Sequence, residues 1–338
     1  MADGPSPPTI VASAQVGARH DRWWLPAAML LLAGALVLGV MVGPAGNWGT
    51  ASWNIVWNVR MPRVALAGIV GAMLSIAGAS YQGVFRNPLV DPYLLGVAAG
   101  AGLGATIVFA LGRATTTGWL VDPLPLASFV GGLLAVLLTY LVGSTVGTGR
   151  TGVTLVLAGV AVTSLATAIQ AFVLQRNNDV IREVYGWILG RLTTADWGDV
   201  RLVLPYVVVS CAVLLLHRRH LDVLRVGDDE AAALGTQVRR VRLAVVIAAT
   251  MGTAAVVSVS GLIGFVGIVV PHAIRLIVGA SYRRLLPLSL LVGASFLILA
   301  DIPGRILQDP AETPIGVVTA FLGAPFFIVI LRTRRSVS

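Results

Sequence analysis

The stretch RVALAGIVGAMLSIAGASYQGV, residues 63–84, holds a single charged side chain, Arg63, at its first position. Its 22 residues would rise about 33 Å as a helix, and the apolar core of a bilayer is about 30 Å thick. A helix of this length on a water-soluble protein would carry a polar face, which this stretch lacks. The sequence therefore predicts a membrane-spanning helix here.

The whole chain has the same character. Of its 338 residues 57% are hydrophobic and 12% charged, and 38 are glycine. Soluble domains carry roughly twice that share of charge, so a soluble globular protein is excluded. One cysteine, Cys211, excludes a disulfide scaffold. We expect an all-α, polytopic membrane protein of about ten transmembrane helices, at residues 23–43, 63–84, 93–112, 120–143, 152–175, 200–217, 241–259, 264–279, 285–302 and 315–332.

Two of these spans are less regular than the others. Residues 23–43 could be a signal peptide, but at about 20 residues they exceed the usual 7–15-residue apolar region, so we expect a membrane anchor. The span at 264–279 is short and interrupted by Pro271, which leaves its limits open. Residues 1–22 are expected to form a disordered cytoplasmic tail, and residues 23–338 one transmembrane domain.

The basic charge predicts orientation. The net charge is +9, and every one of the 24 cationic residues is arginine. With the amino terminus inside, ten spans place 16 arginines on the inner side and 8 on the outer side. This satisfies the positive-inside rule, and it predicts that both termini are cytoplasmic. It also leaves little reason to expect nucleic-acid binding.

The largest inner loop, residues 218–240, is too polar to cross a membrane. Gly227 should break it into two short helices, of which the second has Asp228 or Asp229 as its N-cap and ends at Gly235. Its small apolar tip allows two interpretations. It could lie on the lipid surface, which the flanking arginines favour, or it could dock against a cytoplasmic partner.

Two segments contain helix-breaking prolines. Asn87, Pro88 and Pro92 predict turns between two spans, and such a break is tolerated at membrane depth only where protein or a water-filled cavity covers it. Pro271 should kink the eighth span. The neighbouring His272 could be a metal ligand or a proton carrier, but we expect a hydrogen-bonded structural histidine.

Several charged side chains lie near the expected outer ends of spans. Asp301 and Arg305 are four residues apart and can pair along one helix. Arg60 and Arg63 flank the second span, where they could anchor the helix at the interface or bind acidic groups of a partner. Small residues at Gly96, Gly100 and Gly104 share one helical face and predict close helix packing.

Motifs for covalent chemistry are missing from the sequence. A phosphate-binding loop of the type Gly-x-x-x-x-Gly-Lys-Ser/Thr needs a lysine, and the chain has none. There is no His-Glu-x-x-His or Cys-x-x-Cys motif. We therefore expect no catalytic residue, no metal site and no cofactor bound by this chain.

These segments together resemble the FecCD family of permease subunits, which belong to ATP-driven (ABC) importers for iron siderophores, haem and vitamin B12. The resemblance runs from about residue 25 to residue 333. Its most specific motifs are RMPR (60–63), QGVFRNPLVDP (82–92), LLG (94–96), LAG (157–159), GFVGIVVPH (264–272), LAD (299–301) and PIGVVTAFLGAPFF (314–327).

The resemblance implies a type II importer permease in a bacterial inner membrane, which would move an iron chelate by alternating access. A ferric siderophore is the expected cargo, with haem and cobalamin as alternatives. It also implies a second permease subunit, two cytoplasmic ATPases that use ATP and Mg²⁺, and an extracytoplasmic binding protein. Whether the second permease is a copy or a paralogue stays open.

Residue roles follow only from this resemblance. Arg60, Arg63 and Arg305 occupy positions that dock the binding protein. The gate in residues 143–154 cannot be matched. The positions implied to contact the ATPase, in loop 218–240, are Leu224, Gly227, Asp228, Ala231, Leu234 and Gly235.

Two other classes remain as alternatives. An ion-coupled secondary transporter would need an acidic or polar site at mid-membrane, and a membrane enzyme would need a nucleophile, a metal or an acid–base pair. The sequence shows neither feature.

Overall fold

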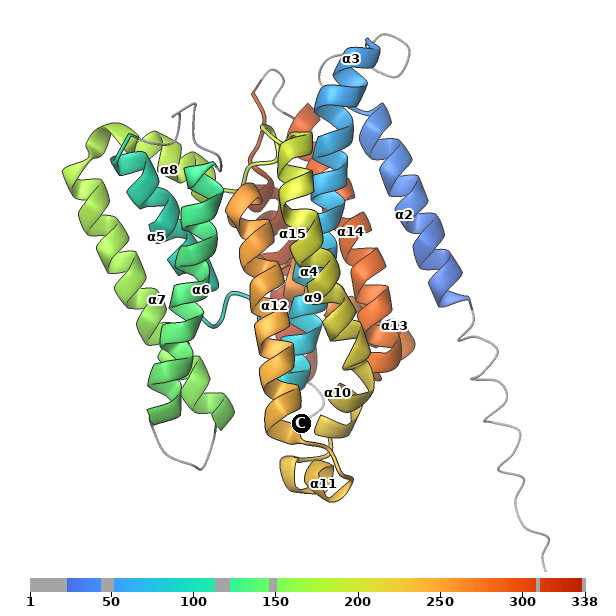
Figure 1. The fold of residues 1–338 in the computed structure, drawn as a ribbon. Coiled ribbons are helices and arrows are strands. Elements are labelled where there is room, and N and C mark those ends of the chain that lie inside the picture. Colours follow the sequence, from blue (N-terminus) through green and yellow to red (C-terminus); the bar gives the residue numbers. More distant parts are fainter. Residues whose placement is uncertain (1–22, 44–51, 113–121, 146–150, 308–310, 336–338) are drawn as a thin grey trace, which may run out of the picture.

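The computed structural model describes residues 23–43, 52–112, 122–145, 151–307 and 311–335. The expected tail, residues 1–22, lies outside these ranges, as do residues 146–150 of the unmatched gate. Within the described ranges the regular structure is entirely helical. Figure 1 shows the helices running side by side, roughly along one direction.

The expected spans all correspond to helices. Seven of the described helices are long and apolar enough to cross a membrane, and three shorter apolar ones match the third, eighth and tenth spans. The prediction of a polytopic, all-α membrane protein is confirmed. The ten helices are α2 (Trp24–Met41), α4 (Met61–Val84), α5 (Val97–Ala110), α6 (Pro123–Thr145), α7 (Thr151–Arg176), α9 (Trp197–Leu216), α12 (Val238–Ser260), α13 (Val266–Val278), α14 (Tyr282–Ile306) and α15 (Ile315–Arg335).

The second span is longer than the sequence predicted. It starts at Trp53, with α3 (Trp53–Ile55) and the π-helical turn η1 (Val56–Arg60) leading directly into α4. Pro62 has no N–H for an intrahelical bond, and the wide turn immediately before it accommodates this break without ending the helix. Arg60 and Arg63 therefore lie inside a continuous helix near its outer end, rather than at its first residues.

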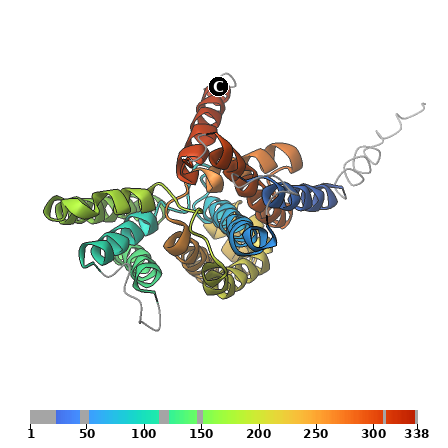
Figure 2. The same cartoon turned by 90° about the horizontal axis from the view of Figure 1, so that it is seen from above.

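Helix α4 forms the centre of the larger helix group. It packs against α9, α12, α13 and α14, and it is the most buried of the seven long spans. Helices α5, α6 and α7 form a second group, which joins the first mainly through α6 against α12. Figure 2, which looks along the helices, shows α15 projecting from the centre and α7 at the outer edge of the second group, beside α5 and α6.

Glycine allows the closest helix crossings, as the spacing of Gly100 and Gly104 predicted. A Cβ atom on Gly100 would lie 2.3 Å from the carbonyl oxygen of Gly131 on α6. A Cβ atom on Gly71 of α4 would lie 2.2 Å from the carbonyl oxygen of Gly293 on α14. Since helices in lipid associate by close packing, these contacts hold α5 to α6 and α4 to α14.

Tryptophan side chains mark one end of the helix bundle. The rings of Trp53 and Trp57 stack with their centroids 6.2 Å apart, and Trp197 packs on Trp57 at 5.5 Å. Tryptophan concentrates at membrane interfaces, so this end lies near one bilayer surface. The same end carries the short helix α8 (Ile181–Ile188), which the sequence analysis did not predict, while α10 (Arg218–Leu224) and α11 (Asp228–Ala233) lie at the opposite end (Figure 1).

Candidate functional site

Helices α10 and α11 form a compact element at the end of α9. Gly227, with a φ of 141°, makes the turn between them. Three acidic residues occupy the first turn of α11, where they complement the positive end of the helix dipole. The expected N-cap, Asp228 or Asp229, was wrong: the N-cap is Gly227, no side chain caps the helix, and the two aspartates are its first residues. Gly235, with a φ of 80°, follows α11 as expected.

The apolar side chains of this element face two ways. Leu221, Leu224 and Ala231 are buried against the helix bundle, and Leu224 is only 1% exposed. Val226 and Leu234 point outward and are 61% and 70% exposed. Among the residues that the sequence singled out, Leu234 therefore presents an apolar surface to its surroundings, whereas Leu224 holds the element to the bundle.

Hydrogen bonds tie α10 to the connection between α13 and α14. The carboxylate of Asp222 accepts bonds from the Ser281 hydroxyl at 2.9 Å and from the Tyr282 backbone N–H at 2.7 Å. The Arg225 guanidinium donates to the Ala280 carbonyl at 3.0 Å. A displacement of α10 would therefore be transmitted directly to the start of α14.

Asp228 links α11 to two further segments. Both of its carboxylate oxygens accept bonds from Arg242 of α12, at 3.1 Å each. Arg86, which follows α4, lies 3.3 Å from the same carboxylate. Asp228 was singled out for its place in the loop, but its two partners were not predicted, because they come from segments distant in sequence.

Hydrogen bonds fix the turn after α4. The side chain of Asn87 accepts a bond from the Leu89 N–H at 3.0 Å. Gln82 donates to the carbonyls of Val90 and Gly267, at 3.2 and 3.0 Å. Asn87 is exposed and Pro88 partly exposed, whereas Gln82 and Val90 are buried, so only the inner side of this connection is covered by protein.

The same connection reaches α13 through Pro92. A Cβ atom on Gly267 of α13 would lie 2.5 Å from the Pro92 ring. Pro271 is buried inside α13, and His272 beside it is buried with its ring edge-on to Phe326 of α15, at a centroid distance of 6.2 Å. Nowhere in the described ranges do three His, Cys, Asp or Glu side chains gather as a metal site would require.

A network of charges lies near the opposite end of the bundle. Arg63 donates to both carboxylate oxygens of Asp301, at 2.8 and 2.9 Å, and to Glu312 at 2.7 Å. Arg305 bonds the same Asp301 carboxylate and also the Gly39 carbonyl at 2.8 Å. The expected pairing of Asp301 with Arg305 is present, but Arg63 was missed as its second partner.

Arg60 belongs to the same region. Its guanidinium donates to the carbonyls of Val40 and Met41, both at 3.2 Å, at the end of α2. Arg60, Arg63 and Arg305 are all buried within the chain. They hold α2, α4 and α14 together at this end, and their role in docking a binding protein stays a prediction.

Known proteins resemble this chain over most of its length. The family model described as the FecCD transport family matches residues 13–333. The cobalamin import system permease protein of Halobacterium salinarum is 43% identical over 83% of this chain and 74% of its own length. The hemin transport system permease protein of Yersinia pestis is 37% identical, over 85% of this chain and 87% of its own.

A solved structure agrees with the fold. It is described as an inward-facing conformation of a transporter of the metal-chelate ABC type. It is 29% identical to this chain, covers 91% of it and 98% of its own length, and superposes with a TM-score of 0.83.

Proposed function

The chain belongs to the FecCD transport family, and on this premise we propose that it is the transmembrane subunit of an ATP-driven importer of a metal chelate. The main support for this proposal is the exposed apolar tip at Val226 and Leu234. The tip belongs to the α10–α11 element, which is bonded to several spans. A surface built in this way suits a partner that pushes on the membrane helices.

The partner at this tip is, in this proposal, a cytoplasmic ATPase. The chain has no lysine and so no phosphate-binding loop, which supports the use of ATP and Mg²⁺ by another subunit. Asp222 and Asp228 would pass movement of the tip to α14, α12 and the end of α4 through the bonds described above. Alternation between outward-open and inward-open states would follow from ATP binding and hydrolysis.

A second permease subunit, either a copy or a paralogue, would complete the path. An apolar cavity of about 570 Å³ lies between α15 and the end of α8. Phe321 and Pro325 of α15 line it, and Phe321 is largely exposed. This weakly polar surface suits the passage of a bulky chelate, because it offers few charges that would retain the cargo.

The proposed cargo is based on the kind of ligand for which the relatives are named. Cobalamin and hemin, named for two of them, are large organic ligands that hold a metal. A ferric siderophore belongs to the same broad class and is the cargo we predict, with haem and cobalamin as the alternatives. We expect most of the selectivity to come from an extracytoplasmic binding protein.

In the cell we propose a bacterial cytoplasmic membrane, with both termini and the α10–α11 element in the cytoplasm. The distribution of arginines supports this orientation. Ion coupling is disfavoured, because Asp301, the nearest candidate for a proton carrier, is held between Arg63 and Arg305.

Reconstitution tests the proposal. The permease, its ATPase and its binding protein would be placed in vesicles, and uptake of a ferric siderophore, hemin or cobalamin measured with ATP inside. We expect uptake of one of the three that needs ATP and survives collapse of ion gradients. Uptake driven by a proton or sodium gradient without ATP would instead support a secondary transporter.

A further inference from the structure

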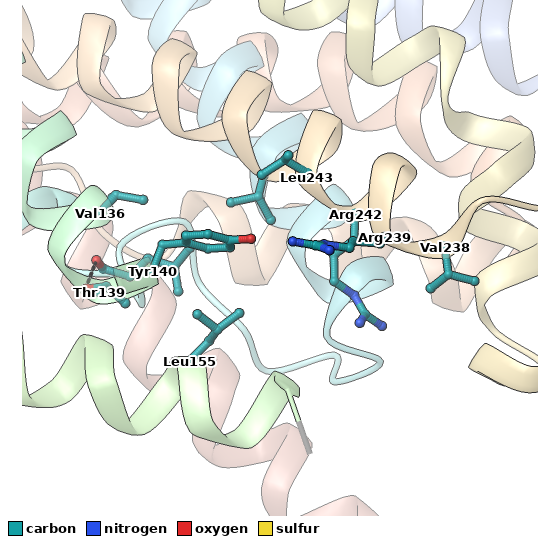
Figure 3. Close-up of a pocket in the computed structure, with 10 residues that line it drawn as sticks. Val136, Thr139, Tyr140, Leu155, Val238, Arg239, Arg242 and Leu243 are labelled. Atoms are coloured by element: carbon teal, nitrogen blue, oxygen red, sulfur yellow. Dashed lines mark hydrogen bonds between the residues drawn. The ribbon is translucent and has the colours of Figure 1, made fainter. Parts of the chain in front are cut away.

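A separate cavity of about 320 Å³ lies between the ends of α6, α7 and α12 (Figure 3). It is at the same end of the molecule as α10 and α11. Its wall is mainly apolar and is formed by Leu95, Val136, Leu155, Leu243 and Val246. The hydroxyl of Thr139, also in the wall, is already bonded to the Leu95 carbonyl at 3.0 Å.

One side of this cavity is positively charged. Arg239 and Arg242 of α12 belong to the lining, which includes no acidic side chain. Figure 3 shows the hydroxyl of Tyr140 on α6 directed across the cavity toward these arginines. Tyr140 and Leu243 are both exposed in part, so the cavity can be entered from the surface of the chain.

The position of the cavity indicates the occupant. The surrounding helices cross a membrane, and Arg239 lies in the first turn of α12, where the chain leaves the polar α11. The guanidinium groups are thus expected at the depth of lipid headgroups, and the apolar wall toward the depth of acyl chains. An amphiphile with one anionic head and an apolar tail matches both parts.

We propose that this cavity binds an anionic phospholipid, which would be a site additional to the transport path. Its phosphate would be held by Arg239 and Arg242, because the guanidinium fork matches two phosphate oxygens, with the Tyr140 hydroxyl as a further donor. One acyl chain would lie on Val136, Leu155 and Val246. Basic pockets between transmembrane helices are a known type of lipid headgroup site.

The lipid would also lie beside the α10–α11 element. Arg242 already donates both of its bonds to Asp228 of α11, so a phosphate beside it would share this guanidinium. Among the described contacts, the ion pairs of α11 are made by Arg242 and Arg86 and not by Arg239. A substitution at Arg239 therefore tests lipid binding without breaking the ion pair that attaches α11.

Native mass spectrometry of the purified permease–ATPase complex tests the site. The complex would be titrated with phosphatidylglycerol or with phosphatidylcholine of the same acyl chains. We expect tighter retention of phosphatidylglycerol, and a loss of about fivefold in its affinity for Arg239→Gln, in line with the contribution of one arginine near a charged lipid surface. Arg283→Gln, an exposed arginine of α14 outside the cavity, is the matched control and should retain the lipid.

A second variant tests the apolar part. Val246→Trp fills the cavity without changing charge, and it should reduce retention of phosphatidylglycerol while Arg239 is intact. Equal affinity for the two lipids would overturn the proposal, as would retention unaffected by both variants. Displacement of the bound lipid by millimolar inorganic phosphate would also overturn it, since the site would then bind a free anion.

Discussion

Arg63 and Asp301 form a two-bond ion pair between two packed helices, joining the start of α4 to the last part of α14, although 238 positions separate them in the chain. Asp301 also neutralises Arg305, which is 1% exposed. A single carboxylate thus compensates two buried guanidinium groups. Because uncompensated charge is costly in a low-dielectric interior, this aspartate stabilises the whole end of the bundle.

Asp301→Asn should therefore destabilise the protein strongly. The substitution keeps the shape of the side chain but leaves two buried arginines with only the partly exposed Glu312 nearby. Loss of one partner from a buried pair costs about 3–5 kcal/mol. Thermal unfolding in detergent should show a clearly lower melting temperature, whereas Glu312→Gln, which removes only the outer partner of Arg63, should have a smaller effect. Equal shifts for the two variants would contradict this assignment.

Leu234→Asp should abolish coupling to the ATPase without unfolding the permease. Leu234 is outward-facing on the tip, so a charge there disturbs only a contact with a partner. ATPase activity stimulated by the loaded binding protein, and uptake into vesicles, should both be lost at normal expression and melting temperature. Retained uptake would instead support the alternative interpretation, in which the α10–α11 element lies on the lipid surface.

Leu224→Asp is the informative comparison for that experiment. The Leu224 side chain is buried against the bundle, and an unpaired buried carboxylate costs several kcal/mol. We expect poor expression or a lowered melting temperature, in addition to lost uptake. Comparison of the two variants should thus distinguish a docking defect from a folding defect. A stable Leu224→Asp protein would show that α10 is not anchored by this residue.

Asp228→Asn should loosen α11 with little effect on global stability. Its carboxylate is partly exposed and bonds Arg242 and Arg86, and ion pairs of this kind contribute about 0–1 kcal/mol. Hydrogen exchange of the α11 amides should become faster while the melting temperature stays close to that of the wild type. Exchange unchanged in α11 would mean that the buried Ala231 and Leu221 hold the element alone.

The spans were predictable because hydropathy is a local property. Each of the ten apolar stretches, including the doubtful one around Pro271, became a helix with limits close to those expected. The main exception is the start at Trp53, where polar Asn54, Asn58 and Arg60 concealed the continuation of the second span. The short helix α8 was missed because its eight residues are amphipathic and follow a polar turn.

Side-chain direction and long-range partners were not predictable in the same way. The sequence could relate Asp301 to Arg305 through their helical spacing, but Arg63 joins them only because α4 packs on α14. Likewise, α10 and α11 are too short to show which of their apolar residues face the bundle. Burial of Arg60, Arg63 and Arg305 could not be read from positions that looked terminal.

Gly131→Ala should destabilise the α5–α6 pair, because the added methyl group has no room. A Cβ atom at this position would lie 2.3 Å from the Gly100 carbonyl oxygen, a distance that requires the two backbones to separate. The melting temperature in detergent should fall, and cross-linking between cysteines placed on α5 and α6 should weaken. Gly34→Ala on α2 is the matched control, since a Cβ atom there meets nothing within 4 Å and alanine is the better helix former. If the two variants melted alike, close glycine contact would not be what holds α5 against α6.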